Sequence, residues 1–328
     1  MLQNQEKFKT MIGGQALIEG IMMRGPKLDA IVTRNKDEIH IETSARKIPQ
    51  KGSVSTWPLI RGAVNFFDAQ VTGVKALMRS ADLSPEEDQQ ESSKFDQWLE
   101  KKLGESKFQS YLIGMAVALG LGMSIVLFFL IPMVVGSFFS QWIHNNFVQN
   151  LLEGCIRIVI FVVYMLLVSR MGEMKRVFAY HGAEHKTIRC YEAGLELTVE
   201  NVRKQTRMHP RCGTSFLLIV MILSILVFSA ASSLLLAAAP GLAAISGSFV
   251  YKLIMIAFKL LMLPLVVAVS YEINRWVGRY DNVFTKILTA PGMWFQNFTT
   301  NEPDDAMIEV GIAALKAVIP ENEGEDKW

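Results

Sequence analysis

The chain has 328 residues, of which 51% are hydrophobic and 20% are charged, and its formal net charge is +2. So large an apolar fraction at this length, with a positive mean hydropathy, excludes an ordinary soluble protein and predicts an integral membrane protein. The sequence contains no repeat of fixed period and no nucleic-acid-binding motif.

Residues 1–58 predict a small cytoplasmic element that contains β-strands. Residues 11–25 place glycines around short apolar runs, a spacing typical of strands, a tight turn and closely approaching backbone. Residues 30–33 and 39–43 then flank the polar Asn35-Lys36-Asp37, which predicts a β-hairpin.

Residues 59–107 are expected to form an amphipathic helix followed by an acidic linker at residues 82–93. Such a helix could pack on the ends of the membrane spans or lie along the membrane surface. Packing is favoured because the polar face of the helix is not especially basic. The apolar residues recur at spacings of three and four: Ile60, Val64, Phe67, Val71, Val74, Leu77 and Met78.

Residues 108–271 predict a membrane domain with about four transmembrane helices. No Asp, Glu, Lys or Arg occurs between Phe108 and Leu152. The second span is short unless Arg157 snorkels and the helix extends to Met171. The expected spans are 111–139, 155–169, 214–239 and 249–271.

Two lysines, Lys252 and Lys259, are seven residues apart in the last expected span and therefore share a helix face. They could line a polar cavity or contact lipid headgroups. Alternatively, they could snorkel toward the outer surface, where Glu153 could pair with one of them.

The distribution of Lys and Arg predicts the orientation in the membrane. Sixteen of them precede Phe108, eight lie between Lys175 and Arg211, and five follow Tyr271, whereas the connections 140–154 and 240–248 have none. Positive residues favour the cytoplasm, so both termini, the loop 171–213 and the C-terminal segment 272–328 are expected on the cytoplasmic side of a bacterial inner membrane. About a hundred polar residues precede the first span, so no cleavable signal peptide is expected.

The loop 171–213 contains the clearest functional motif, His181-Gly182-Ala183-Glu184-His185. The apolar positions around it predict a helix that ends near Gly194 and carries both imidazoles on its apolar face. Two inward-facing imidazoles need partners, and a shared divalent metal would satisfy both. A short capped helix at residues 198–207 would fold the loop back and bring His209 and Cys212 to the same ion.

The order His-x-x-Glu-His matches the inverted zinc-protease signature, in which the histidines bind zinc and the glutamate polarises water. Glu184 is therefore the expected catalytic base, and zinc is the expected metal. The remaining ligands are open among His209, Cys212 and Glu272, in that order of preference. If His209 and Cys212 both bind, the site is closed and structural; if one binds, a position stays open for water. A histidine pair can also serve hydrogen bonding in a protein core without metal.

Four longer motifs carry a resemblance to a known family. They are Gly-Gly-Gln-Ala-Leu-Ile-Glu-Gly-Ile-Met-Met-Arg from Gly13, Tyr-His-Gly-Ala-Glu-His-Lys from Tyr180, His-Pro-Arg-Cys-Gly-Thr-Ser-Phe from His209, and the tail from Thr289 to Asp305. With them the chain resembles the YqhQ-like family of bacterial membrane proteins over nearly its whole length. The resemblance implies a domain of unknown function that is described as a predicted metal-dependent enzyme, and it extends to the candidate ligands and to Glu184. Its genomic association with translation genes implies a role near ribosomes or membrane-protein insertion.

The sequence thus predicts a mainly α-helical integral membrane protein with a small N-terminal β-containing element. The leading functional hypothesis is a metal-dependent, hydrolytic enzyme at the cytoplasmic face of the bilayer. The alternative is a non-catalytic accessory or scaffold protein in membrane-protein biogenesis, near the ribosome or translocon, in which a structural metal holds the loop together.

Overall fold

The computed structural model describes residues 7–36, 38–50, 52–83, 105–139, 141–143, 145–245, 248–322 and 324–327. Most of the acidic linker expected at residues 82–93 lies outside these ranges. The strands are β1 (Gly13–Leu17), β2 (Gly20–Arg24), β3 (Leu28–Asn35) and β4 (Glu38–Ala45). The helices are η1 (Val54–Thr56), α1 (Ile60–Leu83), α3 (Glu105–Ile125), the π-helix η3 (Val126–Leu130), α4 (Ile131–Phe138), α5 (Asn146–Val168), α6 (Gly172–Glu192), α7 (Val199–Arg203), α8 (Gly213–Ala238), α9 (Pro240–Ala244), α10 (Phe249–Arg279), α11 (Val283–Thr299) and α12 (Asp305–Lys316).

The chain divides into two compact units, each built from segments that are separate in the sequence. The first unit comprises Met1–Ser84, Tyr164–Ser224 and Met262–Trp328, and the second comprises Pro85–Val163 and Ile225–Leu261. The first unit therefore combines the N-terminal segment, the loop 171–213 and the C-terminal segment.

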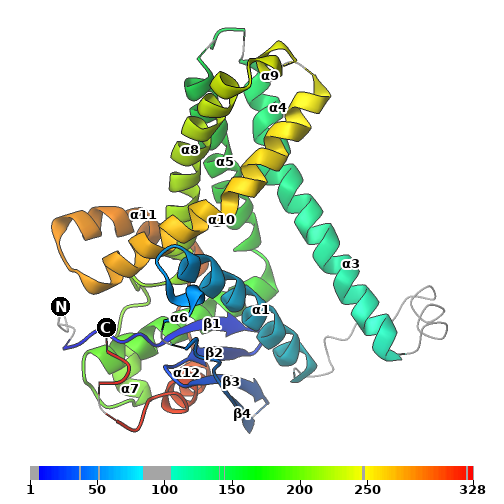
Figure 1. Ribbon diagram of the computed structural model, residues 1–328. Coiled ribbons are helices and arrows are strands. Elements are labelled where there is room, and N and C mark those ends of the chain that lie inside the picture. The colour runs from blue at the N-terminus through cyan, green and yellow to red at the C-terminus, as the bar shows by residue number, and fades with distance from the viewer. Residues whose placement is uncertain are drawn as a thin grey trace. The chain divides into compact units, whose positions relative to one another are not determined.

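The first unit contains a four-stranded antiparallel sheet in the order β1-β2-β3-β4 (Figure 1). The turn between β1 and β2 places Glu19 at a φ of 49°, and β2 pairs with β3 so that Met22 lies opposite Ile31. The hairpin of β3 and β4 turns at the expected position, with Asn35 opposite Glu38. The expected N-terminal β element is confirmed.

Both faces of this sheet are covered. Ile21, Met23 and Val32 point toward a core shared with α6 and α12, whereas Leu17 and Met22 pack with Ala76 of α1 on the other face. Successive strand residues point to opposite faces. Double coverage therefore explains why β2 is apolar along almost its whole length rather than alternating.

Helix α1 lies where the sequence predicts an amphipathic helix, but its buried residues are small rather than bulky. Gly62, Gly73 and Ala76 are buried, and a Cβ at Gly62 would lie 3.0 Å from the Cα of Ala268 on α10. The bulky stripe on the opposite side stays outward, with Phe67 57% exposed.

The two ends of the chain meet in the first unit. Thr10 forms an isolated antiparallel bridge with Lys327, and its hydroxyl donates to a carboxylate oxygen of Asp326 over 2.6 Å. This pairing holds the residues before β1 beside those after α12.

Among the described residues, four helical segments are long and apolar enough to cross a membrane. They are Gly114–Phe138, Phe147–Val168, Gly213–Ala238 and Phe249–Arg279. The expected four-span architecture is thereby confirmed. The second span differs from its expected bounds, because it extends toward the N-terminus, beyond Cys155, rather than toward Met171.

Buried polar partners in the second unit explain this longer span. Glu153 accepts from the Lys259 ammonium group over 2.7 Å, and both side chains are buried. The Arg157 Nε donates over 2.6 Å to the carbonyl oxygen of Phe128, which lies in the π-helix η3. A π-helix disturbs the regular backbone hydrogen-bond ladder, and here one of its carbonyls accepts from the guanidinium. Because Glu153 and Arg157 have partners inside the unit, both charged residues can lie within the span.

Candidate metal centre

Helix α6 carries the central motif and is positioned by its buried face. Tyr180 and Ala183 pack in the core that α6 shares with the sheet, and the last helical residue, Glu192, is followed by the C-cap Ala193 and by Gly194 at a φ of 63°. A left-handed residue after the last turn is a common helix terminator, as the sequence predicted. His181 and His185 lie one turn apart, with ring centroids separated by 4.3 Å.

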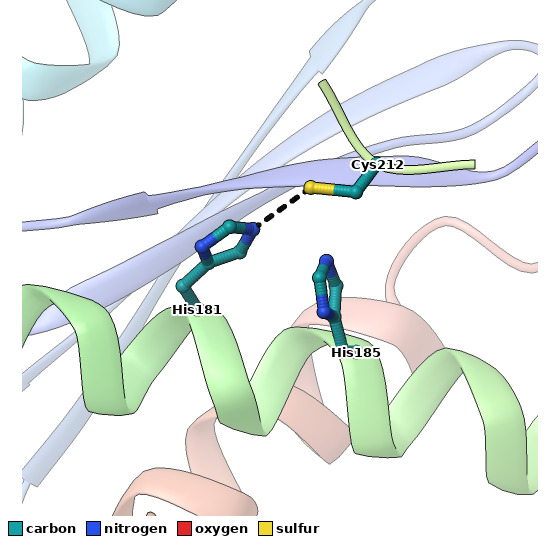
Figure 2. A group of neighbouring side chains, drawn as sticks. All are labelled: His181, His185 and Cys212. Atoms are coloured by element: carbon teal, nitrogen blue, oxygen red, sulfur yellow. Dashed lines mark hydrogen bonds between the residues drawn. The ribbon is translucent and has the colours of Figure 1, made fainter. Parts of the chain in front are cut away.

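Cys212 meets these two imidazoles from the segment just before α8. One ligand atom from each of His181, His185 and Cys212 lies within 4.8 Å of the other two, and Figure 2 shows the thiol facing both rings. The His181 Nε2 is 3.1 Å from the Cys212 Sγ. A tetrahedral zinc ion bound by a nitrogen and a sulfur would hold those atoms ~3.5 Å apart, so the spacing of this pair fits a shared ion with little movement.

The second nitrogen of each imidazole is anchored to a backbone carbonyl. The Nδ1 of His181 is 2.8 Å from the carbonyl oxygen of Thr299, and the Nδ1 of His185 is 2.6 Å from that of Arg207. A carbonyl oxygen can only accept, so both Nδ1 atoms carry a proton, and in the neutral imidazole the Nε2 atom keeps a lone pair. Metal-binding histidines are usually oriented by such a second hydrogen bond.

The Nε2 of His185 is buried and has no hydrogen-bond partner among the described residues. Leaving such an atom unpaired costs roughly 1–3 kcal/mol, so its position needs an explanation. Burial lowers the pKa of His185 to about 4, and the imidazole is therefore neutral at neutral pH. A neutral, unpaired nitrogen that faces a thiol is suited to binding a metal ion.

The surroundings of Cys212 also lower the pKa of its thiol, which favours metal binding. Burial raises its pKa, but the nearby His185 and two hydrogen bonds with Thr214 outweigh burial and lower the pKa below its ordinary value. The Thr214 hydroxyl is 3.2 Å from the Sγ. A thiolate is the form of cysteine that binds metal.

Glu184 lies beside this group rather than within it. One carboxylate oxygen is 3.9 Å from the His181 Nε2, and the side chain is almost fully buried. Burial raises the pKa of Glu184 to about 7, although His181 and the backbone N–H of Gly14 act against the shift. A carboxyl group with a pKa near 7 can accept and release a proton at physiological pH.

His209 is adjacent to the cluster, but its ring nitrogen is directed elsewhere. The ring centroid lies 5.5 Å from that of His185, whereas the Nε2 is 3.2 Å from a carboxylate oxygen of Glu192. The fully buried Glu192 also accepts from Arg211 and from the backbone N–H of Thr10. Among the described residues, the candidate ligands that lie together are therefore His181, His185 and Cys212, without His209.

Glu272, which the sequence analysis ranked third as a further metal ligand, forms an ion pair instead. Its carboxylate accepts from the Nε of Arg61 over 2.6 Å and also forms an ion pair with a terminal nitrogen of that guanidinium. This contact pins the first turn of α1 to α10. As a metal ligand, Glu272 would have to leave Arg61.

Residues near the C-terminus hold the centre together, although sequence reasoning assigned them no role. The buried Gln296 brackets His209, accepting from its backbone N–H over 2.8 Å and donating to its carbonyl over 2.7 Å. The backbone of Asn301 donates to the carbonyl of Phe178 over 2.8 Å and passes so close to α6 that a Cβ at Gly182 would lie 2.0 Å from the Asn301 carbonyl oxygen. The tail motif that begins at Thr289 was the available signal for both residues.

Two comparisons with known proteins match most of the chain. The family described as "Protein of unknown function (DUF1385)" matches residues 57–321. The uncharacterized protein YqhQ of Bacillus subtilis (strain 168) is 30% identical over 331 residues, which cover 96% of this chain and 94% of that protein. No solved structure matches the chain.

Proposed function

The chain belongs to the DUF1385 family, whose function is unknown, and we propose that it is a metal-dependent hydrolase with its active centre at the cytoplasmic face of the membrane. The observation that carries the proposal is the pair of Nδ1-anchored imidazoles that direct their Nε2 atoms to Cys212.

His181, His185 and Cys212 are the proposed ligands. Zinc in proteins takes histidine nitrogen and cysteine sulfur, catalytic zinc sites usually have three protein ligands, and the buried, unpaired Nε2 of His185 supports an ion at this position. His209 as a fourth ligand would have to give up its contact with Glu192. A three-ligand centre is therefore favoured, which leaves one position for water.

Zinc at such a site lowers the pKa of a bound water and polarises a carbonyl or phosphoryl oxygen. Glu184 is the proposed general base. Its carboxyl group is beside His181 and is shielded from solvent, so its ionised form can take a proton from water and return it to a leaving group. The N–H of Gly14 orients this carboxylate.

The distribution of Lys and Arg supports the cytoplasmic location. The eight basic residues between Lys175 and Arg211 lie in the same loop as the centre. Basic loops remain in the cytoplasm.

The substitution Glu184→Gln tests hydrolysis separately from metal binding. The amide has nearly the same shape as the carboxyl group but cannot accept a proton from water, and loss of a general base typically reduces a rate by about 10²–10⁴-fold. We expect Glu184→Gln to retain metal and abundance but to fail to restore function in a strain that lacks the gene. Glu173→Gln, an exposed change in the first turn of α6, is the matched control and should restore function.

Full restoration by Glu184→Gln at normal metal content would refute the hydrolase. That result would leave a structural metal in an accessory protein of membrane-protein biogenesis as the better account.

A further inference from the structure

A second site lies in the first unit, at the end of α10. A cavity of about 790 Å³ is bounded by the N-terminal segment, the C-terminal end of α6, the residues before α8, and the start of α11. None of the proposed metal ligands lines it.

The lining of this cavity is strongly basic. Five of its residues are cationic and one is acidic, the acid being Asp281. The cations are Lys7, Lys9, Arg189, Arg211 and Lys286. Cationic side chains gathered in one concave site create a positive potential that attracts anions.

The cations differ in how they are held. Arg211 donates to the buried Glu192, and the Nε of Arg189 donates over 2.5 Å to the carbonyl of Met208, so both guanidinium groups are fixed before a ligand arrives. The Nζ of Lys286 forms an ion pair with a carboxylate oxygen of Asp281 over 3.4 Å. In the part of the chain that the structure describes, Lys7 and Lys9 form no ion pair. Fixed guanidinium groups beside mobile ammonium groups are a combination suited to phosphate.

Part of the remaining lining is apolar and adjoins a membrane span, whereas Tyr280, Thr285 and Thr289 contribute hydroxyl groups. Phe8, Val277 and Met293 contribute apolar surface, and Val277 belongs to the span that ends at Arg279. Helix α11 begins after residue 282, and its outward face bears exposed apolar side chains: Val283 75%, Ile287 64% and Trp294 54%. Tryptophan at such a position is typical of the membrane–water interface.

We propose that this cavity binds the phosphate group of an anionic amphiphile, with the phosphate at the lysines and arginines and the apolar part against Phe8, Val277 and Met293. The same phosphate chemistry could come from a membrane phospholipid or from a soluble phosphate ester. Continuity with the end of α10 favours the phospholipid. This site does not depend on the metal centre or on hydrolysis.

The test uses the full-length protein in detergent micelles with three probes: dioleoylphosphatidylglycerol, dioleoylphosphatidylcholine and glycerol 3-phosphate. Binding is measured by native mass spectrometry as an apparent Kd for each probe. The double variant Lys7→Gln/Lys9→Gln removes the two lysines for which the described residues supply no carboxylate partner. Lys36→Gln/Lys47→Gln removes the same charge from two exposed lysines outside the cavity and is the matched control. Met293→Gln probes the apolar wall.

For a phospholipid, phosphatidylglycerol should bind more tightly than phosphatidylcholine, and Lys7→Gln/Lys9→Gln should weaken it about tenfold or more while the control does not. Met293→Gln should then weaken the lipid as well. If glycerol 3-phosphate binds as tightly as the lipid and is weakened by the lysine variant but not by Met293→Gln, the site takes a soluble phosphate ester. Equal binding of phosphatidylglycerol to the lysine variant and the control, with no glycerol 3-phosphate site, would overturn the proposal.

Discussion

Gly14 of β1 lies directly against the carboxyl group of Glu184 on α6. A Cβ at this glycine would be 3.0 Å from the Cδ of Glu184 and 2.7 Å from the carbonyl oxygen of Met22. The first strand therefore forms part of the candidate centre, and this explains why a glycine-rich motif near the N-terminus accompanies a histidine motif far along the chain.

Gly14→Ala should therefore destabilise the protein, because the added methyl group meets strand backbone that cannot move freely. Overpacking of this kind typically costs about 1–3 kcal/mol. Gly13→Ala is the matched control, since a Cβ at Gly13 has nothing within 4 Å. Thermal unfolding in detergent should show a lower midpoint for Gly14→Ala only. Equal midpoints for the two variants would contradict the contact.

Gly182→Ala should disturb the centre from the other side of α6. The new methyl group would meet the Asn301 carbonyl oxygen at 2.0 Å, so the tail must move away from the helix. Thr299, whose carbonyl anchors His181, lies two residues before Asn301 and should move with it. We expect reduced metal retention together with a loss of about 1–3 kcal/mol or more in stability.

Gly172→Ala serves as the comparison for Gly182→Ala, because it lies on the same helix and its Cβ would meet nothing within 4 Å. Metal content measured after dialysis should match that of the unaltered protein in Gly172→Ala. An unchanged metal content in Gly182→Ala would show that the segment from Thr299 to Asn301 does not hold His181 in place.

Lys259→Met should destabilise the second unit strongly, because it leaves Glu153 buried without its cation. Breaking a buried ion pair from one side typically costs about 3–5 kcal/mol. The double variant Glu153→Gln/Lys259→Met removes both charges and should recover part of the loss. Lys252→Met, seven residues earlier on α10, should have little effect, because no described carboxylate pairs with Lys252. A chemical unfolding series in detergent would measure all three, and additive losses in the double variant would argue against the pair.

The orientation can be tested with reporter fusions. A fusion after Trp142 or Gly241 should report an extracytoplasmic position, because neither short connection contains Lys or Arg. A fusion after Gly194 should report a cytoplasmic one. An extracytoplasmic Gly194 would invert the topology and place the candidate metal centre outside the cell.

The features that the sequence predicted correctly are those set by local pattern. Short apolar strands around Asn35 and Lys36 determine a hairpin, and the helix that carries His181 ends just before Gly194, because glycine readily adopts a positive φ. The sequence also placed Cys212 among the candidate partners of the two histidines, although it ranked His209 first.

The remaining features depend on contacts between residues far apart in the chain. Arg157 could enter a span because the Phe128 carbonyl accepts its hydrogen bond, a partner that no local pattern indicates. Likewise, His209 is directed at Glu192 rather than at the cluster because Gln296, 87 residues away, fixes its backbone. Sequence spacing alone gives no information about either partner.

The central claim is that His181, His185 and Cys212 bind one metal ion. The most direct test is elemental analysis of the purified protein after exposure to zinc and gel filtration, alongside the single variants His185→Ala, Cys212→Ser, His209→Ala and His40→Ala. We expect about one zinc ion per chain in the unaltered protein, in the exposed-residue control His40→Ala and in His209→Ala, with little or none in His185→Ala and Cys212→Ser. Stoichiometric zinc in a folded His181→Ala/His185→Ala/Cys212→Ser triple variant would contradict the claim.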